Sequence, residues 1–404
     1  MKSDPIIDRI LTGKLVTFEE CRKAWVRMFP LLDELSKTPQ DSEWHAEGNV
    51  GIHTSMVMQE LQDSLEKDTT PEDRLALTLA ALFHDIGKPL VTRETEIRGR
   101  QRISSPRHAE KGLNYLALRL PLLKISAQVQ NRVLALVAYH HHPRKLISND
   151  APRGRFSNLA RMVDLPDLYL LEKADLKGRI CADHEKQMEQ LDLFMIQAGL
   201  HELELVSFDQ IKLLVQATFP KASEAFILHA AAKGQRDFEN GEIQTIEEVV
   251  PRSYQLEQKT FSLKVLCGPS GSGKSTWIDA HSGDDKIVSL DQLRESIAGK
   301  RSSQKQNGRV LQAAKEEIKA ALRTKSNVIF DATNTRIDGR QWVIQLGLDY
   351  GAFVEIIVNR TPIPEIKKRN RKRQHPVPES VLDKQIEGFE WPQIDEAHKL
   401  TIVE

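Results

Sequence analysis

The sequence has little cysteine, no net charge and no long apolar run. Its three cysteines, Cys21, Cys181 and Cys267, are widely spaced and form no C-x-x-C pair, which argues against a disulfide framework or a thiolate zinc site and favours a reducing compartment. The 57 Lys and Arg balance the 57 Asp and Glu, so a polyanionic partner would have to be bound by a local basic patch. Because neither a signal peptide nor a transmembrane stretch is visible, we expect a cytoplasmic protein with no membrane partner.

The 404 residues are too many for one ordinary core, and the apolar periodicity changes near residue 255. Before that point apolar residues recur every three or four positions, so we expect an all-α domain over residues 1–255. After it, short β-like runs alternate with helical segments, which indicates an α/β domain with a parallel sheet over residues 256–404. Residues 185–255 carry no motif, and we expect them to be helices that close the first domain and dock the second.

The most specific motif follows the apolar run FSLKVLC. The segment GPSGSGKST, residues 268–276, matches G-x-x-x-x-G-K-[ST] between an expected strand and an expected helix, the context of a phosphate-binding loop. In such a loop backbone N–H groups surround the phosphates, the lysine reaches the β- and γ-phosphates, and the hydroxyl holds Mg²⁺. The predicted contacts to the NTP are Gly268, Gly271, Gly273, Lys274, Ser275 and Thr276, with Ser275 also on the metal.

Two further strand ends carry acidic residues. In VSLDQLRES, Asp291 ends an expected strand and Arg294 follows three residues later. The carboxylate could accept a proton from an attacking hydroxyl, and the arginine could hold a phosphate of the acceptor. In NVIFDATNT, Asp331 lies where an acidic group near Mg²⁺ is expected, followed by Asn334. The alternative for both strand ends is that the aspartates merely cap helices.

Residues 360–375 carry seven Lys or Arg against one Glu. A run of charges is usually a solvated helix face. Arg369 and Arg373 are four residues apart, so on a helix both guanidinium groups would lie on one face, as a lid over transferring phosphates requires. We therefore predict that both arginines contact the NTP.

The segments GPSGSGKST, SLDQLR, DATNT and RNRKRQHPVPESVL together resemble the 5′-hydroxyl polynucleotide kinase family, which has an adenylate-kinase-like P-loop fold. The resemblance covers most of residues 260–390. It implies that Asp291 is the general base and that Arg294 binds the 3′-side phosphate of the acceptor. It also implies that Lys274 and Ser275 contact the phosphates and magnesium, and that Arg369 and Arg373 are the lid arginines. Asn334 would contact the substrate.

In the helical half, the segment ALFHDIGKPL, residues 81–90, closes the apolar run LALTLAALF. The next two residues after this run are His84 and Asp85. Burying these groups costs several kcal/mol unless hydrogen bonds, opposite charge or a metal compensates. Further histidines and an aspartate lie beside apolar helical segments. Hydrogen-bonded core histidines are the alternative, but together these groups suit Mn, Fe, Co, Ni or Zn, and two such ions would activate water and clamp a phosphoryl group. The predicted ligands are His53, His84, Asp85, His108, His140, His141 and Asp175.

The order of these residues, with the form HDIGK, resembles the HD phosphohydrolase superfamily over residues 45–180. The resemblance implies a core metal, and a second metal held by His108 with His140 or His141; the three histidines of HHHP leave that register open. Lys88 would touch the substrate phosphate or be a plain helix-end lysine. The implied ligands of the core metal are His53, His84, Asp85 and Asp175, with Asp85 also catalytic.

An HD module before a P-loop kinase module resembles the bacterial bifunctional end-healing enzymes called HD-Pnk. The resemblance implies RNA or DNA substrates, from which the HD half removes a 2′,3′-cyclic phosphate or a 2′- or 3′-phosphate. The kinase half would phosphorylate a 5′-OH from ATP or GTP, and a ligase could then join the ends. Two other classes remain open: a nucleotide or second-messenger phosphohydrolase with an NTP-sensing P-loop domain, and a non-catalytic RNA-binding module.

Overall fold

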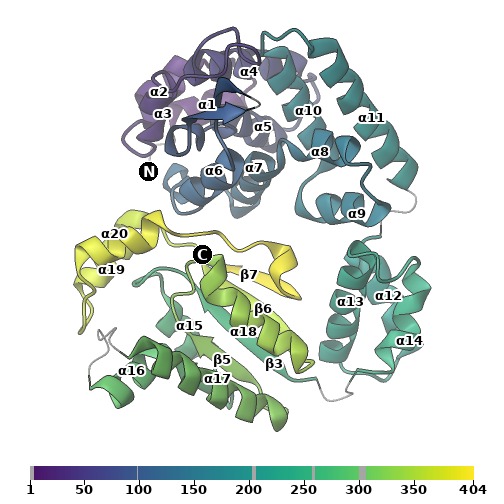
Figure 1. The fold of residues 1–404 in the computed structure, drawn as a ribbon, viewed down its shortest axis with the longest axis vertical. Helices are drawn as coiled ribbons and strands as arrows, with labels where there is room; N and C mark the ends of the chain where they lie inside the picture. Colours follow the sequence, from purple (N-terminus) through teal and green to yellow (C-terminus); the bar gives the residue numbers. More distant parts are fainter. Residues whose placement is uncertain (1–3, 98, 203–205, 257–259, 300–305) are drawn as a thin grey trace. The chain divides into compact units, whose positions relative to one another are not determined.

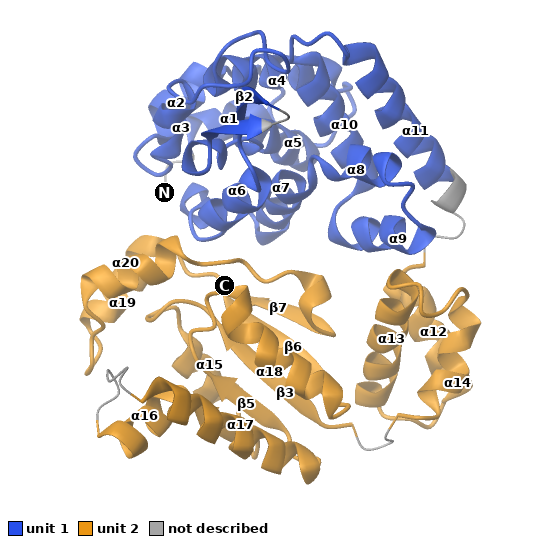
Figure 2. Cartoon of the chain, in the orientation of Figure 1, with its two compact units in different colours: residues 1–205 blue, residues 206–404 orange. Residues whose placement is uncertain are grey.

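The computed structural model of the chain divides into two compact units, residues 1–205 and 206–404 (Figure 2). The structure describes residues 4–97, 99–202, 206–256, 260–299 and 306–404. Within these ranges, none of the helices combines the length and the apolar character needed to span a bilayer.

The first unit is helical apart from one antiparallel hairpin (Figure 1). Its α-helices are α1 (Pro5–Leu11), α2 (Phe18–Trp25), α3 (Leu31–Leu35), α4 (Val50–Ser64), α5 (Pro71–Phe83), α6 (His108–Ala117), α7 (Ala127–Tyr139), α8 (His142–Ser148), α9 (Arg153–Met162), α10 (Leu165–Lys177) and α11 (His184–Glu202). The 3₁₀ turns are η1 (Lys88–Leu90) and η2 (Leu120–Leu123), and the hairpin strands are β1 (Arg93–Ile97) and β2 (Arg100–Ser104). The helical class agrees with the apolar periodicity, whereas the hairpin was not expected because its sequence is almost entirely polar.

Helix α5 forms the centre of this unit. Thr70 caps the helix by accepting a hydrogen bond from the backbone N–H of Asp73 at 3.1 Å, and Pro71 occupies the first helical position, both favourable for starting a helix. Every residue from Leu75 to Phe83 is buried, and helices α1, α4, α7 and α10 pack around α5. The helix is buried on all sides, so its C-terminal end lies inside the protein. The next two residues, His84 and Asp85, are therefore buried as well.

A close approach between backbones then places α6 against the end of α5. A Cβ atom at Gly87 would lie 2.1 Å from the carbonyl oxygen of His108 and 2.5 Å from the backbone nitrogen of Gly112. Only glycine permits this approach. The contact brings His108, the first residue of α6, next to the end of α5.

The second unit contains a parallel sheet with the strand order β4-β5-β3-β6-β7. The strands are β3 (Ser262–Cys267), β4 (Lys286–Ser289), β5 (Val328–Asp331), β6 (Phe353–Asn359) and β7 (Lys399–Val403). The helices are α12 (Phe208–Thr218), α13 (Glu224–Glu239), α14 (Val249–Ser253), α15 (Lys274–His281), α16 (Leu290–Ala298), α17 (Asn307–Arg323), α18 (Ile337–Asp349), α19 (Ile363–Arg371) and α20 (Glu379–Glu387), with 3₁₀ turns η3 (Ile246–Glu248) and η4 (Ile394–Glu396). The parallel sheet was predicted, and β7 is a strand that the sequence analysis did not identify.

Alternate residues of the central strand β3 face two helical layers. Leu266 packs with Ile329 and Ile357 of the neighbouring strands against α15. Leu263 faces α18, which lies along the sheet in Figure 1, and Gly347 of that helix leaves room for the leucine. Because β3 lies between β5 and β6, the loop that follows it opens at the carboxyl edge of the sheet, where ligands of such sheets bind.

Helices α12, α13 and α14 pack on one another and group with the second unit. The apolar periodicity predicts these helices but assigns them to the first domain, with a boundary near residue 255. In the structure the ring of His229 on α13 lies 5.8 Å from Phe353 of β6 and 4.9 Å from His398. Periodicity identifies a helix but not the unit that it joins. Helix α13 packs its apolar residues with those of α12 and α14, and it also makes these ring contacts with the sheet unit.

We expect Gly87→Ala to lower the free energy of unfolding of the first unit by about 1–3 kcal/mol, because the new methyl group would collide with backbone atoms that cannot rotate away. Chemical denaturation of the full chain measures the loss. The matched control is Gly199→Ala in α11, where no described atom lies within 4 Å of the added Cβ. Equal stability of the two variants would contradict the proposed constraint.

Candidate functional site

The residues predicted as metal ligands converge in the interior of the first unit. They come from α4, α6 and α10 and from the ends of α5 and α7. Their nitrogen and oxygen atoms form two groups, each with members within 4.8 Å of one another. The core group is His53, His84 and Asp175, and the second group is His108, His140 and His141.

The core group closes around the imidazole of His53. Its Nε2 lies 2.9 Å from Oδ1 of Asp175 and 3.3 Å from Nε2 of His84. Oδ2 of Asp85 lies 3.3 Å from Nε2 of His84 and 3.7 Å from Nε2 of His53. Two imidazole nitrogens and two carboxylate oxygens therefore surround one small volume.

The second group closes around His108. Its Nε2 lies 3.1 Å from Nε2 of His141, 3.4 Å from Nε2 of His140 and 3.2 Å from Oδ1 of Asp85. Asp85 thus presents a different oxygen to each group. His142 packs its ring against Tyr139 instead, with centroids 4.9 Å apart, so the structure brings the first two histidines of HHHP together with His108.

Backbone carbonyls orient most of these imidazoles. Nδ1 of His84, His108 and His140 each lies 2.8 Å from the carbonyl oxygen three residues earlier in the chain. Nδ1 of His53 lies 3.0 Å from the carbonyl oxygen of Gly178. When Nδ1–H donates to a carbonyl, the lone pair of Nε2 is left for a metal, which is the usual outer-shell arrangement of histidine ligands.

The carboxylates fit a cation because some of their buried oxygens have no hydrogen bond. Oδ1 of Asp85 and Oδ1 of Asp175 are buried and accept no hydrogen bond from the described residues, which is costly without a compensating charge. Burial alone would raise the pKa of Asp85, but Lys88 and the neighbouring imidazoles hold it well below its usual range. Burial also holds the pKa of His140 and His141 well below the usual value. Anionic carboxylates with neutral imidazoles are a donor set for divalent transition metals.

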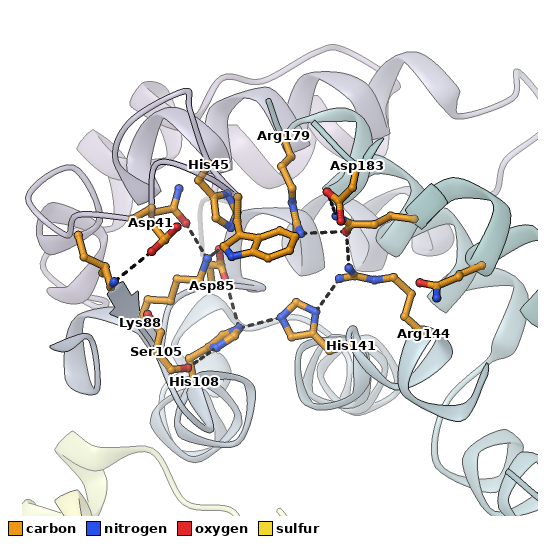
Figure 3. Close-up of a pocket in the computed structure, with 15 residues that line it drawn as sticks. Asp41, His45, Asp85, Lys88, Ser105, His108, His141, Arg144, Arg179 and Asp183 are labelled. Atoms are coloured by element: carbon orange, nitrogen blue, oxygen red, sulfur yellow. Dashed lines mark hydrogen bonds and ion pairs between the residues drawn. The ribbon is translucent and has the colours of Figure 1, made fainter. Parts of the chain in front are cut away.

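A pocket of about 400 Å³ opens beside this cluster (Figure 3). Three cationic side chains line it, Lys88, Arg144 and Arg179. Nζ of Lys88 lies 2.7 Å from Oδ2 of Asp85, and the side chain is buried. Lys88 is therefore part of the site and not a plain lysine at a helix end.

The two arginines are tied to the cluster by acidic groups. Arg179 donates from Nη2 to Oδ2 of Asp175 at 2.7 Å, and Arg144 pairs with the buried Glu172. Nη2 of Arg144 also lies 3.3 Å from Nδ1 of His141. These fixed positive charges line a pocket suited to a phosphate group.

Sequence reasoning missed Arg144, Glu172 and Arg179. Their spacing could have indicated them, because residues three or four apart lie on the same face of a helix. Glu172 lies three residues before Asp175 and Arg179 four residues after it, and Arg144 lies three residues after His141. Glu47 was also missed. Its Oε1 lies 3.2 Å from Nδ1 of His53, and no spacing rule connects a loop residue with that helix.

In the second unit, the predicted phosphate loop joins β3 to α15. Gly268 and Gly271 lie in the loop, and Gly273 is the N-cap of α15 with φ 106°, a conformation that favours glycine. Ser275 and Thr276 are exposed in the first turn of α15. Backbone amides and hydroxyls at this helix N-terminus can therefore receive phosphates.

The side chain of Lys274 is folded back into this loop. Its Nζ donates to the carbonyl oxygens of Gly268 at 2.8 Å and Pro269 at 3.0 Å. Burial lowers the pKa of Lys274 to about 8, partly opposed by the charge of Asp331. Asp331 in turn accepts a hydrogen bond from Ser289 at 3.0 Å, which joins the ends of β5 and β4.

The acceptor-side pair lies on the first two turns of α16. Arg294 donates to Asp291, whose side chain is exposed. The negative charge of Asp291 acts to raise the pKa of Lys274, against the effect of burial. Asn334 is different, because its buried amide donates to the carbonyl oxygen of Leu266 at 2.7 Å and thus supports the strand before the loop.

The two predicted lid arginines do not share one helical face, so that expectation is wrong. Helix α19 ends at Arg371, and Arg373 lies in the turn beyond it. The helix stops because the side chain of Asn370 forms hydrogen bonds with both backbone groups of Val377 and folds the following loop back. Arg369 nevertheless approaches the phosphate loop, because its Nη1 lies 3.3 Å from the position that a Cβ atom at Gly273 would take. The positive charge of Arg373 acts to lower the pKa of Lys274.

Two families match parts of the chain. Residues 50–176 match the HD domain family, and residues 263–392 match a family described as AAA domain. The chain therefore carries an HD domain in its helical unit and a P-loop domain around the parallel sheet.

The relatives among curated proteins include multifunctional CCA proteins. That of Shewanella frigidimarina is 27% identical over 212 residues, which are 50% of this chain and 45% of that protein. That of Pseudoalteromonas atlantica is 31% identical over 172 residues, 40% of this chain and 38% of that protein. The matched part spans less than half the length of these relatives.

Two solved structures also match part of the chain. Their titles are "Structure of the Pnkp1/Rnl/Hen1 RNA repair complex" and "Structure of Pnkp1/Rnl/Hen1 complex". The first is 26% identical with a TM-score of 0.29 and covers 32% of this chain and 44% of that one. The second is 27% identical with a TM-score of 0.25 and covers 29% and 40%.

We expect chelator-treated protein to bind about two Mn²⁺ ions per chain, one for each group beside Asp85. His53→Ala and His140→Ala should each leave about one ion, and Asp85→Ala should abolish tight binding, because its oxygens face both groups. Titration calorimetry with elemental analysis gives these numbers. His229→Ala, which removes a buried histidine of the second unit, should bind as the wild type does. Unchanged binding by both single-group variants would refute the assignment.

NTP affinity should fall as the pH rises above about 8. The free protein loses the Lys274 proton near that pH, whereas bound phosphates favour the charged ammonium, so binding at higher pH requires proton uptake and weakens by up to about tenfold per pH unit. ATP dissociation constants measured from pH 7 to 10 would show the slope. Lys274→Arg, whose guanidinium stays charged, should remove it. Identical slopes in the two proteins would contradict the role of Lys274.

Proposed function

We propose that the chain is a bifunctional nucleic-acid end-healing enzyme. Its first unit hydrolyses a 2′,3′-cyclic phosphate, or a 2′- or 3′-phosphate, at a strand end. Its second unit transfers the γ-phosphate of ATP or GTP to a 5′-OH, which leaves ends that a ligase can join. The observation that carries the hydrolytic half is the pair of donor groups on either side of Asp85, next to a pocket lined by three cations.

The hydrolytic site combines a metal centre with a phosphate pocket. Divalent transition metals held there would lower the pKa of water and neutralise phosphoryl charge. The residues that would hold them are His53, His84, Asp85 and Asp175 on one side, and Asp85, His108, His140 and His141 on the other.

The cations of the pocket serve the substrate itself. Lys88, Arg144 and Arg179 bind the phosphate through charge-assisted hydrogen bonds. Opening a cyclic phosphate adds one water across a P–O bond, so the product monoester carries more negative charge than the substrate. Three cations around the pocket stabilise that increase. The acidic partners Asp175 and Glu172 hold the two guanidinium groups in place.

In the kinase unit, Asp291 accepts the proton of the 5′-OH while Arg294 holds the neighbouring phosphate of the acceptor strand. Lys274 and the lid arginines stabilise the charge that develops on the γ-phosphoryl group. Ser275, exposed in the first turn of α15, would hold Mg²⁺. The Asp291 and Arg294 pair supports transfer to an acceptor over mere NTP sensing, because a sensor has no use for a base and a cation beside the loop.

The test uses an oligonucleotide with a 5′-OH and a 2′,3′-cyclic phosphate, incubated with an NTP and divalent ions, with both ends analysed. Asp291→Ala should lower 5′-phosphorylation at least about 100-fold, the usual loss of a general base, and leave 3′-end hydrolysis intact. Asp85→Ala should abolish 3′-end hydrolysis and leave 5′-phosphorylation intact. Loss of both activities from either substitution would refute the two-site assignment.

Asp338→Ala is the matched control for the kinase variant. Asp338 also pairs with an arginine, Arg336, at 3.1 Å, but it is exposed on α18, so its loss should leave both activities unchanged. Wild-type protein that hydrolyses phosphate ends yet transfers no γ-phosphate would replace the kinase proposal with an NTP-sensing role for the P-loop.

A further inference from the structure

Trp44 presents an aromatic ring at the pocket of the first unit. Its side chain is 41% exposed and is among the residues that line the pocket. Trp25, Trp277 and Trp391 are buried in contrast. An exposed aromatic ring does not gain the stabilisation that burial would give it. Because Trp44 lies beside a cationic pocket, its exposed ring indicates contact with a ligand.

The indole of Trp44 is held in position by its neighbours. Cζ of Arg102 lies over the ring, 5.7 Å from its centroid. Nε of Arg102 in turn lies 2.8 Å from Oδ2 of Asp41, which also accepts a hydrogen bond from the backbone of Ile103 at 3.2 Å. These contacts tie the segment that carries Trp44 to strand β2, and the ring is a fixed platform with an exposed part toward the pocket.

A second observation on the same segment concerns Gln40. This residue is only 8% exposed and lines the same pocket. Its Oε1 accepts a hydrogen bond from Nζ of Lys88 at 2.7 Å. Its Nε2 is buried and has no hydrogen-bond partner among the described residues. A buried amide donor without a partner, fixed beside Lys88 at the pocket, indicates that an oxygen or ring nitrogen of a ligand accepts its hydrogen bond.

We infer that the pocket binds the whole terminal nucleoside of the strand, with its base stacked on Trp44 and the amide of Gln40 donating to the sugar or base. The inference rests on the proposed hydrolytic function and adds its substrate class. The pocket of about 400 Å³ is in the size range of small-molecule sites and larger than a phosphate requires. Because every base has an aromatic face, stacking predicts little preference among the four bases.

The test compares two five-membered cyclic phosphates, a nucleoside 2′,3′-cyclic monophosphate and glycerol 1,2-cyclic phosphate, which has no base. Trp44→Ala should lower kcat/KM for the nucleoside substrate about tenfold or more, mainly by raising KM, and leave kcat/KM for the glycerol substrate unchanged. Trp44→Phe should restore most of the loss because it keeps an aromatic face. Trp44→Leu, which keeps apolar bulk alone, should behave like Trp44→Ala.

The outcomes separate this inference from the function on which it rests. Equal losses on both substrates, or no loss on either, would overturn the stacking role while the hydrolytic function stands. Full activity of Trp44→Leu on the nucleoside substrate would also overturn the stacking role and leave the hydrolytic function standing. Wild-type protein that hydrolyses neither substrate nor a phosphate-terminated strand would overturn the proposed hydrolytic function and this inference together.

Discussion

The two oxygens of the Asp85 carboxylate face opposite ways inside a helical core, and the first unit is organised around satisfying them. Oδ2 is directed to His53 and His84, and Oδ1 to His108. A carboxylate buried in this way needs a strong compensating charge. The burial of α5, the close backbone approach at Gly87 and the carbonyls that orient the imidazoles all serve to bring donor atoms to this carboxylate. The same elements leave a pocket on one side of the cluster, lined by Lys88, Arg144 and Arg179.

In the proposed function the two units would bind phosphate by different physical means. The helical unit uses side chains, with cations held by buried acids such as Asp175 and Glu172. The sheet unit would use the backbone amides of a loop at the N-terminus of α15 together with Lys274, whose Nζ lies inside that loop. The first arrangement suits a phosphate at the end of a chain that enters a pocket. The second suits the triphosphate of a nucleotide, whose charge is spread along several groups.

Much of this architecture could be predicted from the sequence, since apolar periodicity identifies α5 and four of the five strands of the parallel sheet, and the predicted metal ligands lie close together in the helical unit. The missing parts depend on tertiary contacts. Arg179 belongs to the site because it follows the end of α10 and pairs there with Asp175. Gln40 and Trp44 belong to it because Arg102 and Ile103 of β2 hold their segment in place. Helix α19 ends at Arg371 because the side chain of Asn370 forms hydrogen bonds with the backbone of Val377, seven residues further along the chain. The grouping of α13 with the sheet likewise follows from its contacts and not from its pattern.

The central claim is that two ions share the carboxylate of Asp85. Anomalous diffraction at the manganese edge, from crystals equilibrated with Mn²⁺, tests it most directly. The account predicts two peaks on either side of Asp85, about 3.5–4 Å apart, one beside His53 and the other beside His108. A single peak, or peaks only at surface carboxylates with the imidazoles bonded to one another, would contradict it.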